Sequence, residues 1–190
     1  NANAVAGELC SWIDRGYDVI ALIPSCALML KFEWSLIVPD SDDVARLSAA
    51  TSDIAEYIVA IAKDEGLADG MAPLGAAVAV HIACHARAQN MGQKAAEMLR
   101  LLPETEVRVI ERCSGHGGSW GIMKENFDVA LKIGRPVARD AAKDSPGFVV
   151  SECPLARDHI LQGIERLGEP VDGITPAQHP VELMARAYGL

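Results

Sequence analysis

The stretch Ala76-Ala77-Val78-Ala79-Val80-His81-Ile82-Ala83-Cys84 decides the fold, because it is an almost continuous apolar run that ends at a cysteine. An apolar run of this length predicts a buried strand, and the helical periodicity of residues 86–102 predicts a helix directly after it. The run is interrupted by His81, and a buried polar group in such a position is normally satisfied by hydrogen bonds. We therefore expect His81 to be a structural residue of the strand.

The same unit of strand, cysteine and helix recurs twice further along the chain. Residues 107–111 form a second predicted strand before a cysteine, and a helix is expected over about residues 120–142. Residues 148–151 form a third predicted strand before a cysteine, and a helix is expected over residues 155–167. Strands that alternate with helices predict an α/β fold, with a parallel sheet and helices on both of its faces.

Cys84, Cys113 and Cys153 follow the three predicted strands at the same point of the repeated unit. In a parallel sheet, the loops beyond the carboxyl ends of the strands lie at one edge, where such folds bind their ligands. We expect the three sulfur atoms to lie within roughly 7 Å of one another, the separation that shared metal ligation allows. Cys10, which has no motif around it, is expected to lie elsewhere.

The N-terminal part of the chain predicts a smaller version of this unit. Residues 17–23 read as an apolar strand, and Pro24-Ser25-Cys26 begins a helix, in the same order as residues 148–155. We therefore expect a pseudo-repeat of two cysteine-rich units. The chain would divide into a boundary segment over residues 1–16, the C-terminal remnant of a first unit with a helical connector over residues 17–70, and a second unit over residues 71–190.

Polar residues between these segments have the composition of helix starts. Residues 39–43 supply capping side chains for a short helix, and residues 51–53 do the same for a helix over residues 54–65. We expect both helices to be scaffold.

The composition excludes several classes of function. The 190 residues include 17 Lys and Arg against 26 Asp and Glu, a net charge of −9 without a dense basic stripe, so no nucleic-acid partner is expected. The longest apolar stretches fall short of the roughly 20 residues of a membrane-spanning helix, and no signal-type segment is found, so we expect a cytoplasmic chain. The five cysteines lack the density of a secreted disulfide scaffold.

Side chains suited to metal ligation surround the three cysteines. Cys84-His85-Ala86-Arg87 places a thiol, an imidazole and a cation at a helix start, and Cys113-Ser114-Gly115-His116 places a second thiol and imidazole in a loop whose glycines let the backbone approach a bound group. Thiolates and imidazoles bind zinc, and three thiolates with one further ligand can hold an iron–sulfur cluster. We predict as metal ligands Cys84, Cys113, Cys153 and His116, with His85 as the competing fourth ligand and Arg87 as a cation beside the centre. The donor types leave the choice between zinc and an iron–sulfur cluster open.

At these motifs the sequence resembles the cysteine-rich (CCG-domain) iron–sulfur oxidoreductases, a family that includes subunits of heterodisulfide reductase and of anaerobic glycerol-3-phosphate dehydrogenase. The resemblance covers about residues 17–190 and is greatest to the glycerol-3-phosphate dehydrogenase branch. It is carried by Cys84-His85-Ala86-Arg87-Ala88-Gln89, Arg112-Cys113-Ser114-Gly115-His116-Gly117-Gly118-Ser119-Trp120-Gly121, Lys132-Ile133-Gly134-Arg135-Pro136 and Glu152-Cys153-Pro154-Leu155-Ala156. The family pattern has a cysteine pair where this chain has Cys113-Ser114, and a second cysteine where it has Ala156.

The resemblance implies a chain that holds the tail of one cysteine-rich unit and the whole of a second, without the family's N-terminal ferredoxin-like module. It implies a protein that passes electrons from a flavin dehydrogenase partner toward a membrane quinone, peripheral to the inner membrane through its partners. The implied cofactor is an iron–sulfur cluster, or zinc. Purification in air is expected to leave the centre empty or filled with zinc, because thiolates bind zinc and are readily oxidised.

A second class of function stays open beside this one. The same cysteines could hold zinc, or no metal, in an assembly module that docks partner subunits. A thiol–disulfide enzyme is disfavoured, because the chain contains no C-x-x-C motif. Cys26, His159 and His179 lie outside the ligand motifs, and we expect structural roles for them.

Overall fold

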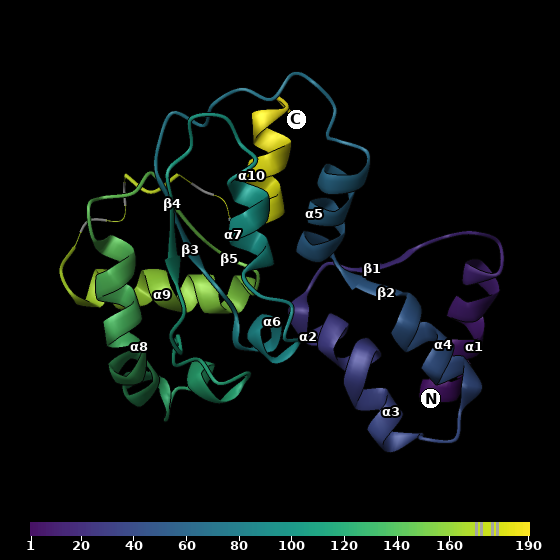
Figure 1. Cartoon of the computed structure of the whole chain (residues 1–190). Coiled ribbons are helices and arrows are strands. Elements are labelled where there is room, and N and C mark those ends of the chain that lie inside the picture. Colours follow the sequence, from purple (N-terminus) through teal and green to yellow (C-terminus); the bar gives the residue numbers. More distant parts are fainter. Residues whose placement is uncertain (170, 172, 176, 178) are drawn as a thin grey trace. The chain divides into compact units, whose positions relative to one another are not determined.

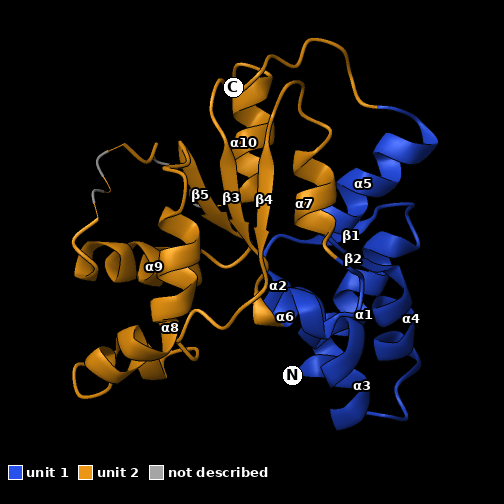
Figure 2. Ribbon diagram, turned by 60° about the vertical axis from the view of Figure 1, so that its left-hand side comes forward, with its two compact units in different colours: residues 1–66, 85–92 blue, residues 67–84, 93–190 orange. Residues whose placement is uncertain are grey.

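The computed structural model describes residues 1–169, 171, 173–175, 177 and 179–190, and Figure 1 shows the whole chain. The chain forms two compact units (Figure 2): the first comprises residues 1–66 and 85–92, and the second comprises residues 67–84 and 93–190. Each unit contains a small parallel sheet with helices, so the expected α/β class is confirmed. The sheets have two and three strands, and a pseudo-repeat between them stays a prediction.

The second unit is built on three parallel strands in the order β4-β3-β5. The strands are β3 (Val78–His81), β4 (Val107–Ile110) and β5 (Phe148–Ser151). In the pairing register, Val78 lies between Val107 and Phe148, and His81 lies between Ile110 and Ser151. The three carboxyl ends therefore lie at the same edge of the sheet.

Helices cover both faces of this sheet, as predicted. The helices are α7 (Lys94–Leu99), α8 (Phe127–Ala142), α9 (Pro154–Arg166) and α10 (Pro180–Ala187). Ala79, Ile110 and Val149 belong to the core cluster formed with α8 and α9. Side chains alternate between the faces of a strand, so Phe148 faces the other way, and there the guanidinium of Arg186 in α10 lies 5.6 Å from its ring centre.

Two helices begin or end away from their predicted bounds. The helix expected over residues 86–102 is divided into α6 (Cys84–Ala88) and α7. The two helices are separated by Asn90 and Gly92, whose φ angles are 58° and 82°. Residues in this left-handed conformation end an α-helix. The helix expected over residues 120–142 begins as a separate 3₁₀ turn, η2 (Trp120–Ile122), and α8 follows from Phe127.

The loop after β4 rests directly on the backbone of α8. A Cβ atom added at Gly134 of α8 would lie 2.2 Å from the carbonyl oxygen of Ser114, and one added at Gly115 would lie 2.3 Å from that of Ala130. Gly115 also has a φ of 90°, which L side chains rarely adopt. The sequence suggested that the loop glycines serve a bound group, and these contacts show that Gly115 is required for packing on α8.

The first unit consists of short helices around a two-stranded sheet. Its helices are α1 (Ala2–Ile13), α2 (Pro24–Leu28), a π-helical turn η1 (Met29–Glu33), α3 (Trp34–Ile37), α4 (Asp42–Ala50) and α5 (Ile54–Asp64), and its strands are β1 (Val19–Ala21) and β2 (Thr51–Asp53). Ala6 and Cys10 of α1 pack with Val44 and Leu47 of α4 in a small core. Residues 1–16, expected as a boundary segment, thus contain a helix of this unit.

Strand β2 was not predicted from the sequence, because its residues have the composition of a helix cap. Thr51–Asp53 pairs in parallel with Val19–Ala21. Asp53 has the predicted capping role as well, since its side chain accepts a hydrogen bond of 3.0 Å from the Ala55 N–H at the start of α5. Residues 51–53 therefore form strand β2 and also supply the N-cap of α5.

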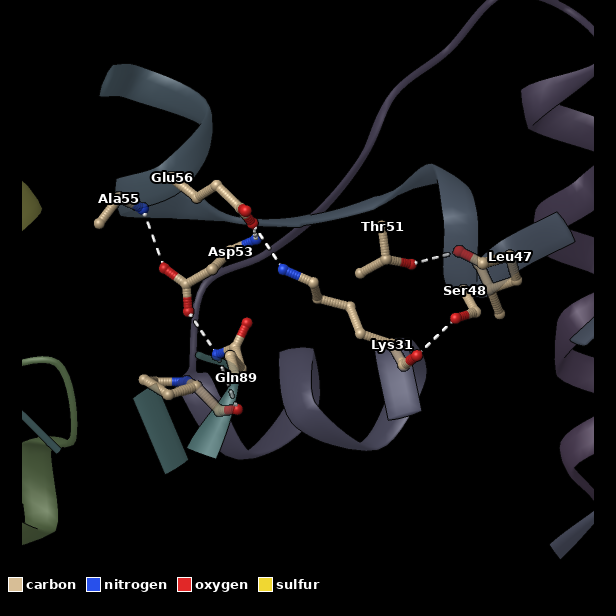
Figure 3. A network of polar contacts seen from close by, with 9 residues as sticks. Lys31, Leu47, Ser48, Thr51, Asp53, Ala55, Glu56 and Gln89 are labelled. Atoms are coloured by element: carbon tan, nitrogen blue, oxygen red, sulfur yellow. Dashed lines mark hydrogen bonds and ion pairs between the residues drawn. The ribbon is translucent and has the colours of Figure 1, made fainter. Parts of the chain in front are cut away.

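A polar network holds these elements together inside the first unit (Figure 3). The second carboxylate oxygen of Asp53 accepts a hydrogen bond of 3.2 Å from Nε2 of the buried Gln89, which belongs to the 85–92 segment. Lys31 forms a 2.6 Å ion pair with Glu56 of α5 and accepts, through its carbonyl, a hydrogen bond from Ser48. Asp53 thus ties residues 85–92, which follow Cys84, to α5.

In the part of the chain that the structure describes, no helix combines the length and apolar character needed to cross a membrane.

We predict that Asp53→Ala lowers the free energy of unfolding by about 1–3 kcal/mol. The change removes a helix cap, which is worth about 0.5–2 kcal/mol, and a buried hydrogen bond, which is worth about 1 kcal/mol. Urea unfolding followed by circular dichroism measures the loss. Asp53→Asn should recover most of it, because Asn also caps helices, and Asp40→Ala at an exposed position should change little. Equal stability of Asp53→Ala and Asp40→Ala would contradict the role of this carboxylate.

We further predict that Gly134→Ala lowers the melting temperature by about 2–8 °C. The added methyl group overpacks the loop against α8 at a cost of about 1–3 kcal/mol, which exceeds the helix propensity gained from Ala, and each kcal/mol shifts Tm by about 2–4 °C at this chain length. Gly173→Ala is the matched control, since a Cβ there would meet nothing within 4 Å. Thermal unfolding of both variants tests the contact, and a Gly134→Ala protein that melts with the wild type would disprove it.

Candidate metal centre

The three predicted cysteines lie just beyond the carboxyl ends of the three strands. Cys84 begins α6 after β3, Cys113 begins the loop after β4, and Cys153 is the N-cap residue of α9 after β5. Because the strands are parallel, all three residues lie at the same edge of the sheet. Convergence on one edge follows from the topology, as the sequence indicated.

The side chains at this edge surround a small cavity of about 70 Å³. It is lined by His81, Ala83, Cys84, Arg112, Cys113, Ser114, His116, Gly117, Cys153 and Ala156. All of these residues belong to the second unit. The three cysteines are free thiols, with Cys84 and Cys113 exposed and Cys153 half-buried. One cavity therefore carries the three predicted thiol ligands and the predicted imidazole ligand.

Two of the predicted ligands, Cys153 and His116, have their Sγ and Nε2 atoms 3.7 Å apart. A tetrahedral ion bound at about 2.3 Å from sulfur and about 2.0–2.1 Å from nitrogen would separate the two ligand atoms by about 3.6 Å. The observed distance agrees with shared ligation. His116 is itself buried, and its carbonyl accepts a 2.7 Å hydrogen bond from the N–H of Gly121, which closes the loop that carries it.

The thiols of Cys84 and Cys113 line the same cavity. Among the described residues, no three His, Cys, Asp or Glu side chains are close enough together to hold a metal ion as they stand. Thiols and an imidazole are nevertheless the donors that zinc and iron–sulfur clusters take. The donor set thus fits such a centre, and ligation by Cys84 and Cys113, with sulfurs within roughly 7 Å, stays a prediction.

His85 and Arg87 do not appear in the described lining of the cavity. Both side chains are exposed, and both residues belong to the 85–92 segment of the first unit. Their predicted roles, as an alternative fourth ligand and as a nearby cation, remain predictions.

Three buried polar side chains connect the strand ends at the cavity: His81, which the sequence predicted to be structural, and Ser151 and Glu152, which it did not single out. Nδ1 of the buried His81 lies 2.9 Å from Oγ of Ser151, and its Nε2 lies 2.8 Å from the carbonyl oxygen of Arg112. Glu152, also buried, accepts a 3.0 Å hydrogen bond from the N–H of Ala83. The prediction of a satisfied core imidazole at His81 is confirmed. Ser151 and Glu152 could have been identified from the sequence as two polar residues in succession at the end of an apolar strand.

The remaining histidines have surroundings that suit structural roles. His159 is buried in α9 with its ring edge-on to Phe127 at 5.9 Å. Burial lowers the pKa of His159, and the nearby backbone of Ala130 opposes this lowering, although neither ring nitrogen makes a hydrogen bond of normal geometry. Nδ1 of His179 accepts a hydrogen bond from Val181 and so caps α10.

The two remaining cysteines belong to the first unit. Cys26 is an exposed residue of α2. Cys10 is buried, and its thiol lies 3.4 Å from the carbonyl oxygen of Asp43. Burial raises the pKa of the Cys10 thiol, which keeps it in the unreactive protonated form.

The part of the chain that carries the cavity is similar to known proteins. Residues 78–155 match the model of a cysteine-rich domain family, CCG. The chain is 26% identical, over 91% of its length, to a subunit of the anaerobic glycerol-3-phosphate dehydrogenase of Escherichia coli, of which it covers 41%. It is 31% identical, over 60% of its length, to an uncharacterized iron-sulfur protein of Methanocaldococcus jannaschii, of which it covers 24%.

The chain thus spans about two fifths or less of these relatives. The matched residues 78–155 include every thiol of the cavity, its buried histidines and all three strands of the second sheet. Motif, topology and family model agree on the same segment. In residues 78–155 the chain is thus similar to the cysteine-rich (CCG) domain family.

Proposed function

We propose that the chain is an electron-transfer part of an iron–sulfur oxidoreductase, with its redox centre at the carboxyl edge of the β4-β3-β5 sheet. The observation that carries the proposal is the gathering of three free thiols and a buried imidazole around one cavity. Cys84, Cys113 and Cys153 would hold the centre as thiolates, and His116 would complete it as the fourth ligand.

The named relatives support this class of function. One belongs to an anaerobic glycerol-3-phosphate dehydrogenase as one of its subunits, and another is an iron-sulfur protein. By this likeness we infer a complex in which a flavin dehydrogenase partner and a ferredoxin-like module supply electrons and a membrane quinone receives them. The chain would then work on the cytoplasmic side, peripheral to the inner membrane through its partners.

An iron–sulfur cluster, when bound, supplies one-electron chemistry at a potential that depends on its charge, hydrogen bonds and solvent exposure. The protein's own residues determine these three factors here. Cys84 and Cys113 are exposed, so this side of the centre is open to a redox partner. Cys153 and His116 lie deeper and would fix the centre to the N-terminus of α9, and Arg87 would add positive charge near Cys84.

A zinc-binding assembly module is the second candidate, favoured by the same pair distance. The 3.7 Å between Cys153 Sγ and His116 Nε2 suits a tetrahedral zinc ion, and three cysteines with one histidine are a common structural zinc set. In that case the domain would dock partner subunits without carrying electrons. Metal content separates the two functions: iron with acid-labile sulfide supports the first, and one zinc per chain in protein prepared without air supports the second.

We predict that Cys113→Ser and Cys153→Ser each abolish formation of the centre. A neutral hydroxyl is a poor substitute for a charged thiolate toward a soft metal. Iron and acid-labile sulfide per chain, measured after reconstitution without air, should fall from the wild-type value to background. Cys26→Ser, at another exposed cysteine, is the matched control and should retain the wild-type content. Full iron content in Cys113→Ser and Cys153→Ser would show that these cysteines are not ligands and would contradict a metal centre at this edge of the sheet.

Comparison of His116→Ala with His85→Ala identifies the fourth ligand. His116→Ala should lose most bound metal, because the His116 ring lies at ligand distance from Cys153. His85→Ala should bind within a few-fold of the wild type. Metal affinity by competitive chelation gives the answer, and the reverse ranking of the two variants would assign the role to His85. A loss of only about 10–100-fold for His116→Ala would place the ring in a supporting hydrogen bond instead.

A further inference from the structure

We propose that His81, Ser151 and Glu152, the strand-end network, are positioning residues that set the spacing of the three cysteines. The inference rests on the proposed metal centre and goes beyond it, because it assigns the ligand geometry to side chains that are not ligands. It follows from where the hydrogen bonds of these three buried side chains end.

Apart from the contact between His81 and Ser151, each contact of the strand-end network fixes the residue directly before a cysteine, or the cysteine itself. His81 Nε2 contacts the carbonyl of Arg112, which precedes Cys113, at 2.8 Å. Glu152, which precedes Cys153, accepts a 3.0 Å hydrogen bond from the N–H of Ala83, which precedes Cys84. Each of the three cysteine-bearing turns is therefore held by a contact of one of these buried side chains.

The directions of these hydrogen bonds form one consistent chain. A carbonyl oxygen can only accept, so Nε2 of His81 carries the proton that it donates to Arg112. Ser151 Oγ accepts a 3.3 Å hydrogen bond from the N–H of Cys153, which leaves the hydroxyl proton free to be donated to Nδ1 of His81, 2.9 Å away. The chain runs from the backbone of Cys153 through Ser151 and His81 to the residue before Cys113.

The position of the strand-end network explains how it can control all three turns. His81 is the last residue of the central strand β3, and its register partners are Ile110 on one neighbour and Ser151 on the other. His81, Ser151 and Glu152 are each at most 2% exposed, so their hydrogen bonds do not compete with water. The paired register of β3 ends at this level, and the side chains of the network continue the connection toward the cysteines.

The test uses the whole 190-residue chain, stripped of metal without air and titrated with Co²⁺, whose thiolate absorption reports binding by the cysteines without a cluster being assembled. Ser151→Ala, His81→Phe and Glu152→Leu each replace a polar side chain by an apolar one and so remove the network contacts. Loss of a side chain that orients metal ligands typically weakens binding about 10–100-fold. We expect that loss in each variant, with a changed absorption spectrum.

Two further variants separate positioning from general stability. Val150→Ala leaves a cavity in the same strand, on the opposite face from Ser151, so it should lower Tm and keep the Co²⁺ affinity of the folded protein. Glu152→Gln keeps an acceptor for the Ala83 N–H and should restore binding lost in Glu152→Leu. The positioning role is overturned if Val150→Ala weakens Co²⁺ binding as much as Ser151→Ala does. It is also overturned if Glu152→Gln binds Co²⁺ as weakly as Glu152→Leu.

The outcomes also separate this inference from the proposed function. A wild-type chain that gives no Co²⁺–thiolate absorption contradicts the metal centre itself. A wild-type chain that binds Co²⁺, together with network variants that bind it equally tightly and with the same spectrum, retains the centre and removes the strand-end network from it.

Discussion

Parallel pairing of β3 with both of its neighbours is the constraint on which the candidate site depends. In the pairing register His81 lies beside Ile110 and Ser151, so the three strands end at the same position in the sheet. A cysteine two or three residues later on each strand must then lie at the same edge. Antiparallel pairing of any strand would send its cysteine to the far edge, and the shared cavity would not exist.

Two kinds of tight packing then limit where the loops at this edge can go. Glycine contacts hold the loop after β4 against α8, with no room for a side chain between Gly134 and the carbonyl of Ser114. The hydrogen bonds of His81, Ser151 and Glu152 hold the cysteine-bearing turns against the strand ends. The ligand-bearing residues are thus supported by backbone on one side and by buried polar groups on the other, as pre-organised sites require.

Elements that depend on local periodicity, such as β5, could be predicted from the sequence. Elements and contacts that depend on residues far away along the chain were missed. β5 begins and ends at the predicted residues because its apolar run is short and sharply bounded. β2 was missed because Thr51–Asp53 gains its strand character only by pairing with residues 19–21. Glu152 was missed because its partner, Ala83, lies 69 positions away along the chain. Local patterns carry no information on such contacts, so the position of the cysteines after the strands was predictable, whereas among their supports only the buried His81 was.

The contrast between the exposed and buried parts of the site bears on its chemistry. Cys84 and Cys113 are exposed, whereas His116 and the network beneath the cavity are buried. An electron-transfer centre needs both conditions, since a partner must come close on one side while the ligands move little when the charge changes. In the proposed electron-transfer function, the side with Cys84 and Cys113 is therefore the one that a redox partner would approach.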